Sequence, residues 1–202
     1  MKETRPSVGP TWRSVFYTAL IYGGAALLFT LLGVLQGPTV AQIGTTRPAD
    51  TIPGHLIELA VFGLLLAAVC IVGFGREGLP FVLLLPVLTL LLDIDHLPAY
   101  LGSAETIRPA HSLLFLAFVL AATAITIKAL DTELVVASAF MTHMAIDTGL
   151  FAPWSPLSFQ YIQLDPYRPI FAVGAVACAA AAGLVLRVRK MADNHGRGAN
   201  NG

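Results

Sequence analysis

The strongest constraint on the fold is residues 15–35, a run of apolar and neutral side chains with no charge. A helix needs about 20 mainly apolar residues to cross the roughly 30 Å hydrocarbon core of a bilayer. Charged residues make up only 12% of the 202-residue chain, about half the share found in soluble domains. The sequence therefore predicts an integral membrane protein. The run exceeds the roughly 7–15 apolar residues of a signal peptide, so we expect a retained helix.

Six apolar segments predict an all-α fold, an integral membrane helix bundle with about six transmembrane helices. They are residues 15–35, 55–74, 79–92, 111–129, 134–151 and 170–186. The third segment would span only about 21 Å, so the acidic residues after it lie below the membrane surface or mark an early helix end. We expect one transmembrane domain over 15–187, a cytoplasmic tail over 1–14 and a disordered polar tail over 188–202.

Lysine and arginine predict the orientation, because these residues are retained on the cytoplasmic side of a membrane. With both termini inside, nine of the twelve fall on the inner side. These are Lys2, Arg5, Arg13, Arg76, Lys128, Arg187, Arg189, Lys190 and Arg197. The outer side keeps Arg47, Arg108 and Arg168. The sequence therefore predicts an N-in, C-in topology.

The other unusual polar residues gather on the outer side of this topology. They are His55, Asp93, Asp95, His96, Arg108, His111, His143 and Asp147. Every histidine except His195 belongs to this group. Ionisable residues inside a membrane are costly, and they usually face the bundle interior and mark functional sites. The sequence therefore predicts one polar site near the extracytoplasmic face.

The stretch HMAID places His143 and Asp147 on one face of an apolar helix, because residues four apart are neighbours there. They can serve as a hydrogen-bonded pair between helices or as two metal ligands, and both interpretations stay open. In DID, Asp93 and Asp95 would point to nearly opposite sides of a regular helix. They converge on one ion only if the helix unwinds; otherwise they simply end it. His96 is a ligand or a surface group.

The stretches PGH and PAH each place a histidine, His55 or His111, at the start of an apolar helix. The positive helix end disfavours the imidazolium ion, and a metal needs neutral imidazole. Arg108 adds a positive charge suited to phosphate. Ser112 is expected to cap the helix. The aromatic and proline-rich stretch 151–169 is expected to form an interfacial belt or a lid.

Together these residues predict a metal site of oxygen and nitrogen ligands. The expected ligands are His55, Asp93, Asp95, His111, His143 and Asp147. Such a set suits zinc, with manganese or iron as alternatives. Three carboxylates favour two divalent ions, or one ion with a carboxylate left as general base. Asp95, Arg108 and His111 are the expected catalytic residues.

The order of GHLIELA, LLLDIDH, RPAHSLL and HMAIDTGLFAPWSP resembles a family of small prokaryotic inner-membrane proteins. These are described as membrane-bound metal-dependent hydrolases, some of them under LexA control. The last stretch is more distantly similar to zinc-dependent phospholipase C and single-strand nucleases. The resemblance covers residues 54–158 and implies the ligand set given above. Many members carry histidine where this chain has Ile107, which removes one candidate ligand or acid.

Three functions stay open on the sequence. The first is hydrolysis of a phosphoester, such as a phospholipid or another anionic small molecule, at the extracytoplasmic face of the inner membrane. The second is a non-catalytic scaffold whose polar network fixes helix packing, and the third is a metal-ion carrier. The zero net charge gives no reason to expect a nucleic-acid partner, and the oligomeric state is not predicted.

Overall fold

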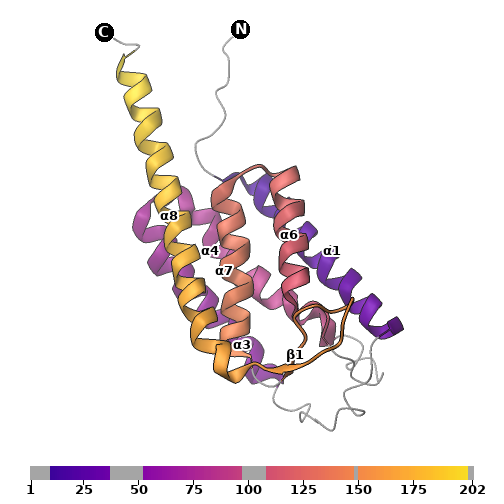
Figure 1. The fold of residues 1–202 in the computed structure, drawn as a ribbon. Coiled ribbons are helices and arrows are strands. Elements are labelled where there is room, and N and C mark those ends of the chain that lie inside the picture. Colours follow the sequence, from indigo (N-terminus) through magenta and orange to yellow (C-terminus); the bar gives the residue numbers. More distant parts are fainter. Residues whose placement is uncertain (1–9, 37–51, 97–107, 148–149, 200–202) are drawn as a thin grey trace.

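The fold is a bundle of helices, shown in Figure 1 as a computed structural model that describes residues 10–36, 52–96, 108–147 and 150–199. The main helices are α1 (Trp12–Gln36), α3 (Ile52–Leu66), α4 (Leu79–Leu91), α6 (Leu113–Thr126), α7 (Leu130–Ile146) and α8 (Arg168–Ala199). A π-helical turn, Ala67–Ile71, and short 3-10 turns connect α3 to α4. The only strands in the described part are β1 (Leu150–Phe151) and β2 (Ile162–Gln163), which pair antiparallel. The all-helical architecture predicted from the sequence is confirmed.

Four of the helical stretches are long and apolar enough to cross a membrane. They are Trp12–Leu35, Leu56–Phe74, Arg76–His96 and Asp165–His195. Of the remaining two predicted spans, 111–129 contains the shorter helix α6. The span 134–151 was misplaced, because α7 begins at Leu130 and ends at Ile146, and Leu150–Phe151 form β1. At 1.5 Å per residue these helices are about 21 and 26 Å long. The described chain therefore has four helices suited to cross a membrane, and the two shorter helices are not among them.

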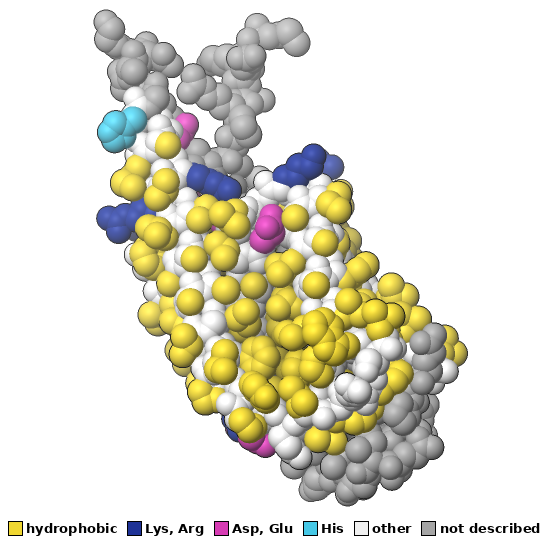
Figure 2. All heavy atoms as spheres, viewed as in Figure 1, with side chains coloured by type: hydrophobic (Ala, Val, Ile, Leu, Met, Phe, Trp, Pro, Cys, Tyr) yellow, Lys and Arg dark blue, Asp and Glu magenta, His cyan; other side chains and the backbone are white. Residues whose placement is uncertain are grey.

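The lateral surface carries the side chains that such helices need. Large apolar side chains are exposed along α1, α3, α4 and α8, including Phe16, Leu35, Phe62, Leu83 and Val173. Figure 2 shows a broad apolar zone between two ends at which the charged side chains gather. Water would solvate such a zone poorly, whereas lipid chains solvate it well.

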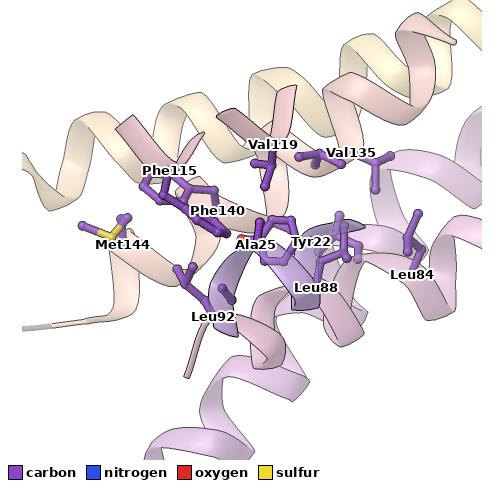
Figure 3. Close-up of a cluster of buried hydrophobic side chains, with 14 of the residues drawn as sticks. Tyr22, Ala25, Leu84, Leu88, Leu92, Phe115, Val119, Val135, Phe140 and Met144 are labelled. Carbon is purple, nitrogen blue, oxygen red and sulfur yellow. The ribbon is translucent and has the colours of Figure 1, made fainter. Parts of the chain in front are cut away.

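Helix α7 lies inside the bundle, in contact with α3, α4, α6 and α8. Most of its side chains are buried, including the polar Ser138, whose Oγ donates a 2.8 Å hydrogen bond to the Ala175 carbonyl of α8. Burial on all sides explains how a helix with several polar residues fits among apolar neighbours. Figure 3 shows the adjoining core. The rings of Tyr22 and Phe115 pack edge to face there, with their centroids 5.1 Å apart.

The C-terminal part differs from the sequence prediction, because α8 continues as a helix to Ala199 where we expected disorder from residue 188. Two ion pairs attach this part to the bundle. Arg189 Nη1 lies 2.9 Å from Asp131 Oδ2, and Lys190 Nζ lies 2.7 Å from Glu77 Oε1. The arginine, lysine, methionine and alanine residues of this stretch also favour helix, a preference that the polar composition concealed.

Candidate metal centre

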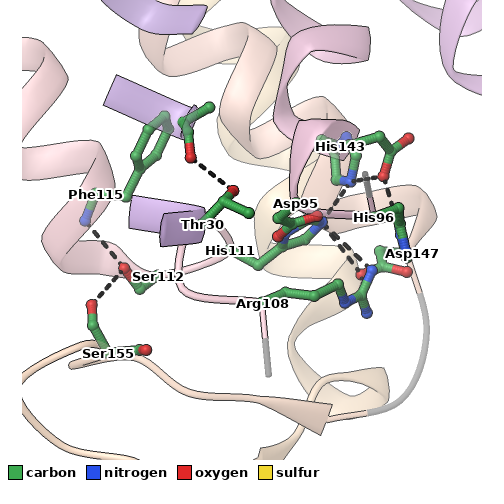
Figure 4. A network of polar contacts seen from close by, with 12 residues as sticks. Thr30, Asp95, His96, Arg108, His111, Ser112, Phe115, His143, Asp147 and Ser155 are labelled. Carbon is green, nitrogen blue, oxygen red and sulfur yellow. Dashed lines mark hydrogen bonds and ion pairs between the residues drawn. The ribbon is translucent and has the colours of Figure 1, made fainter. Parts of the chain in front are cut away.

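The polar site is assembled by three segments that meet at the end of the bundle opposite the C-terminus (Figures 1 and 4). The 3-10 turn Leu92–His96 at the end of α4 contributes Asp93, Asp95 and His96. The residues before α6 contribute Arg108 and His111, and the last turn of α7 contributes His143 and Asp147. All except the partly buried Arg108 are buried, and His143 is 0% exposed.

The end of α4 brings the ligand atoms of the two aspartates close together in a way that the sequence did not predict. The chain does not simply unwind; it tightens into a 3-10 turn over Leu92–His96. With three residues per turn, Asp93 and His96 share one side, and their Oδ1 and Nε2 atoms lie 3.4 Å apart. Ligand atoms of Asp93, Asp95 and His96 all lie within 4.8 Å of one another. His96 therefore belongs to the cluster and is not a surface group.

The protonation of His143 follows from what it contacts. Its Nδ1 lies 2.8 Å from the backbone carbonyl oxygen of Thr89, which can only accept a hydrogen bond. Nδ1 therefore carries a proton and donates it to that carbonyl. In the neutral imidazole, the other nitrogen, Nε2, then presents a lone pair to the cluster.

The same reasoning applies to His111. Its Nδ1 lies 2.7 Å from Oδ2 of Asp95, and an ionised carboxylate also only accepts. Nδ1 of His111 is therefore the donor, and Nε2 again presents a lone pair. Carboxylates and backbone carbonyls hold metal-binding histidines in this manner, because they fix both the tautomer and the ring orientation.

The two Nε2 atoms of His111 and His143 lie only 2.7 Å apart (Figure 4). Two lone pairs at this distance repel each other unless a cation lies between them. That cation is either a proton on one of the rings or a metal ion bound by both. Neutral imidazole nitrogens are common metal ligands, so the arrangement fits a metal site on chemical grounds.

Two carboxylates complete this set of nitrogen atoms. Oδ1 of Asp93 lies 3.5 Å from Nε2 of His143, and Oδ2 of Asp147 lies 3.7 Å from Nε2 of His111. Bonds of about 2.0–2.1 Å to a tetrahedral zinc ion place its ligand atoms roughly 3.3 Å apart. The two carboxylate contacts are close to this spacing, whereas the two Nε2 atoms would have to move apart from 2.7 Å to bind one ion. Asp93, His111 and His143 thus form a buried group that can hold a metal ion, and Asp147 adjoins it.

Asp95 has a position different from that of a simple ligand. Its Oδ2 is engaged with His111, so this oxygen orients the imidazole. Its Oδ1 is buried and makes no hydrogen bond within the described part of the chain. Asp95 can therefore hold His111 in place through one oxygen while the other accepts a proton or a ligand.

Arg108 supplies the fixed positive charge at the site. Its Nη2 lies 2.7 Å from Oδ2 of Asp147, and its Nη1 lies 3.4 Å from Nε2 of His111. Burial alone disfavours the charged guanidinium, but attraction to Asp147 and Asp95 outweighs it and raises the pKa of Arg108. Three aspartates and one arginine give the described cluster a formal charge of −3 + 1 = −2. A single divalent cation would neutralise it.

The predicted residues therefore fall into two groups. The structure brings together Asp93, Asp95, Arg108, His111, His143 and Asp147. The side chain of His55 lies outside the described residues.

Ser112 caps α6 as predicted, because its Oγ accepts a 3.0 Å hydrogen bond from the amide of Phe115. The same hydroxyl donates to the Ser155 carbonyl, which connects the start of α6 to the loop between β1 and β2. The Thr89 carbonyl was missed, since a backbone acceptor has no signature in residue type.

No protein-family model, curated protein or solved structure matches this chain. The family resemblance of residues 54–158 thus stays a prediction.

Proposed function

We propose that this protein is a membrane-embedded metal-dependent hydrolase that cleaves a phosphoester. Asp93, His111 and His143 would hold one divalent ion, with Asp147 as a fourth ligand. Zinc suits this mixture of two nitrogen and two oxygen donors best, with manganese or iron as alternatives. A single ion is favoured because it balances the −2 charge of the described cluster.

The observation that carries this proposal is the pair of Nε2 atoms 2.7 Å apart, each on a ring whose Nδ1 is already engaged. A network without metal would need a proton on one of these two nitrogens, which forms an N–H···N hydrogen bond in place of the repulsion. The buried negative charge around them makes a divalent cation a better occupant than one proton.

The surrounding residues suit hydrolysis of an anionic substrate. A bound metal ion would lower the pKa of a coordinated water and so supply the nucleophile. The planar guanidinium of Arg108 matches the geometry of a phosphate group and would orient it. Asp95 would keep His111 in the correct tautomer, and its second oxygen is available to accept a proton.

The substrate class follows from the location of the site. We place the protein in the inner membrane with six crossings and both termini in the cytoplasm. Both ends of the described chain lie at one end of the bundle, and the cluster lies at the other, which agrees with this topology (Figure 1). A site at the extracytoplasmic surface would meet lipid headgroups, so a phospholipid or another amphiphilic phosphoester is the expected substrate.

The first experiment is elemental analysis of protein purified in mild detergent without chelator. We expect about one zinc, manganese or iron ion per chain, lost in His143→Ala and retained in the matched control His195→Ala. His195 is exposed on α8, and its Nδ1 lies 3.0 Å from the Met191 carbonyl oxygen of the same helix. Metal-loaded protein should then hydrolyse phospholipid or a chromogenic phosphodiester, and His143→Ala should not.

A scaffold is the second candidate, because the pairs Arg108–Asp147 and His111–Asp95 also connect segments of the bundle. It predicts no metal in either protein, even after zinc is offered, and full tolerance of Asp95→Asn. Bound metal without any hydrolysis would instead support a structural metal site. These outcomes separate metal binding from catalysis.

A further inference from the structure

A second feature at the same end of the bundle is a pocket of about 380 Å³ between α3, α7 and α8. This volume lies within the range of small-molecule sites. Its walls are mainly apolar, with Phe62 and Leu66 from α3 and Val176 from α8. The lining also contains two charged residues of opposite sign, Glu58 and Arg168.

The arginine of this pocket is held in a defined position. Arg168 Nε donates a 2.9 Å hydrogen bond to the Ala145 carbonyl near the end of α7, and Nη1 lies 3.5 Å from Asp165 Oδ1. The side chain is 38% exposed, so the guanidinium remains accessible from outside. Glu58, nearly two turns into α3, is exposed as well. An apolar pocket thus carries a cation and an anion in its lining.

We infer that this pocket binds a phospholipid whose headgroup carries a primary amine. The phosphate would pair with Arg168 and the ammonium group with Glu58, while an acyl chain would lie along Phe62, Leu66 and Val176. The charge pattern favours this occupant over a purely anionic lipid, whose headgroup would meet the Glu58 carboxylate. A hydrocarbon chain without a headgroup would offer no charged group to Glu58 or Arg168.

The pocket is separate from the metal centre. Thr142, Ala145 and Ile146 line it, whereas His143 and Asp147 contribute to the cluster. At about 100° per residue, these two sets lie on different sides of α7. The inference therefore goes beyond the proposed hydrolase and does not require it.

The test is native mass spectrometry of the full chain in detergent, with lipids of identical acyl chains. Phosphatidylethanolamine should bind about tenfold more tightly than phosphatidylglycerol or phosphatidylcholine, since a hydrogen bond to a charged group is worth roughly one decade in affinity. Arg168→Gln should weaken binding of all three lipids. Glu58→Gln should abolish only the preference for the amine. Arg187→Gln, which removes an exposed arginine of α8 at the opposite end, is the matched control.

A variant that fills the pocket gives an independent readout. Ala172→Phe should reduce phosphatidylethanolamine binding at least tenfold while the metal content stays unchanged. Equal binding of the three lipids, or tighter binding of phosphatidylglycerol, would overturn the assignment of the amine. Unaltered binding in both Arg168→Gln and Ala172→Phe would overturn the site itself.

Discussion

Replacing Asp93 with asparagine separates a metal site from a structural network, because the two predict opposite responses to zinc. The side chain keeps its shape but loses a negative charge from the cluster. Ligand oxygens of Asp93 and Asp95 lie within 4.8 Å of each other. Two like charges at that distance repel by about 3.5 kcal/mol at an effective dielectric constant of about 20. Proton uptake by the metal-free cluster reduces this repulsion energy.

Without metal, Asp93→Asn should therefore be as stable as the original protein or more stable. With zinc the order should reverse. A ligand at 100 times its dissociation constant stabilises the folded state by about 2.7 kcal/mol, which is roughly 5–10 °C in Tm for a chain of this size. The original protein should show this shift, and the variant, which lacks one charged ligand, should show little of it.

The assay is thermal unfolding in detergent, with chelator and then with added zinc. Asp131→Asn is a suitable control, because Asp131 is also buried but pairs with Arg189 at the far end of the bundle. It should lose stability to the same extent in both conditions. Two results would refute the assignment of a metal to this cluster. One is an equal loss of Tm in Asp93→Asn with and without zinc, and the other is an unchanged Tm of the original protein when zinc is added.

Four further outcomes are expected. Metal retention should fall as the pH drops, because protons compete with the metal for the imidazole nitrogens, as elemental analysis after dialysis would measure. Arg108→Gln should keep the metal but weaken inhibition of hydrolysis by inorganic phosphate about tenfold. The raised pKa of Arg108 keeps the guanidinium charged, so its titration should not weaken phosphate binding to the original protein between pH 7 and 10. Ser112→Ala should lower stability by about 1–2 kcal/mol, measured as a Tm decrease, because the cap of α6 is lost. Gly183→Ala should destabilise by about 1–3 kcal/mol in the same assay, since a Cβ there would lie 2.7 Å from the Cys70 carbonyl and 2.9 Å from Phe74 Cβ.

The sequence predicted the helices because their apolar runs are long and their ends are marked. It located the residues of the cluster because histidine and aspartate are rare inside a membrane. Four features depend on the folded chain and could not be predicted. These are the 3-10 turn at Asp93, the role of Asp95 in orienting His111, the Thr89 carbonyl acceptor, and the enclosure of α7 by its neighbours. Each arises from segments distant in sequence or from backbone atoms.

The position of α7 also bears on how the protein is made. Helix α7 begins with Asp131 and Glu133 and contains the polar residues Ser138 and His143, so it would enter lipid poorly by itself. A short turn at Ile127–Ala129, with Lys128 in the left-handed conformation at φ 56°, joins it to α6. The two helices are therefore suited to leave the insertion machinery as a hairpin. In the proposed six-span topology, their final membrane integration would wait until α8 has been synthesised and can shield α7. The candidate metal ligands on α7 would then be among the last to reach their place.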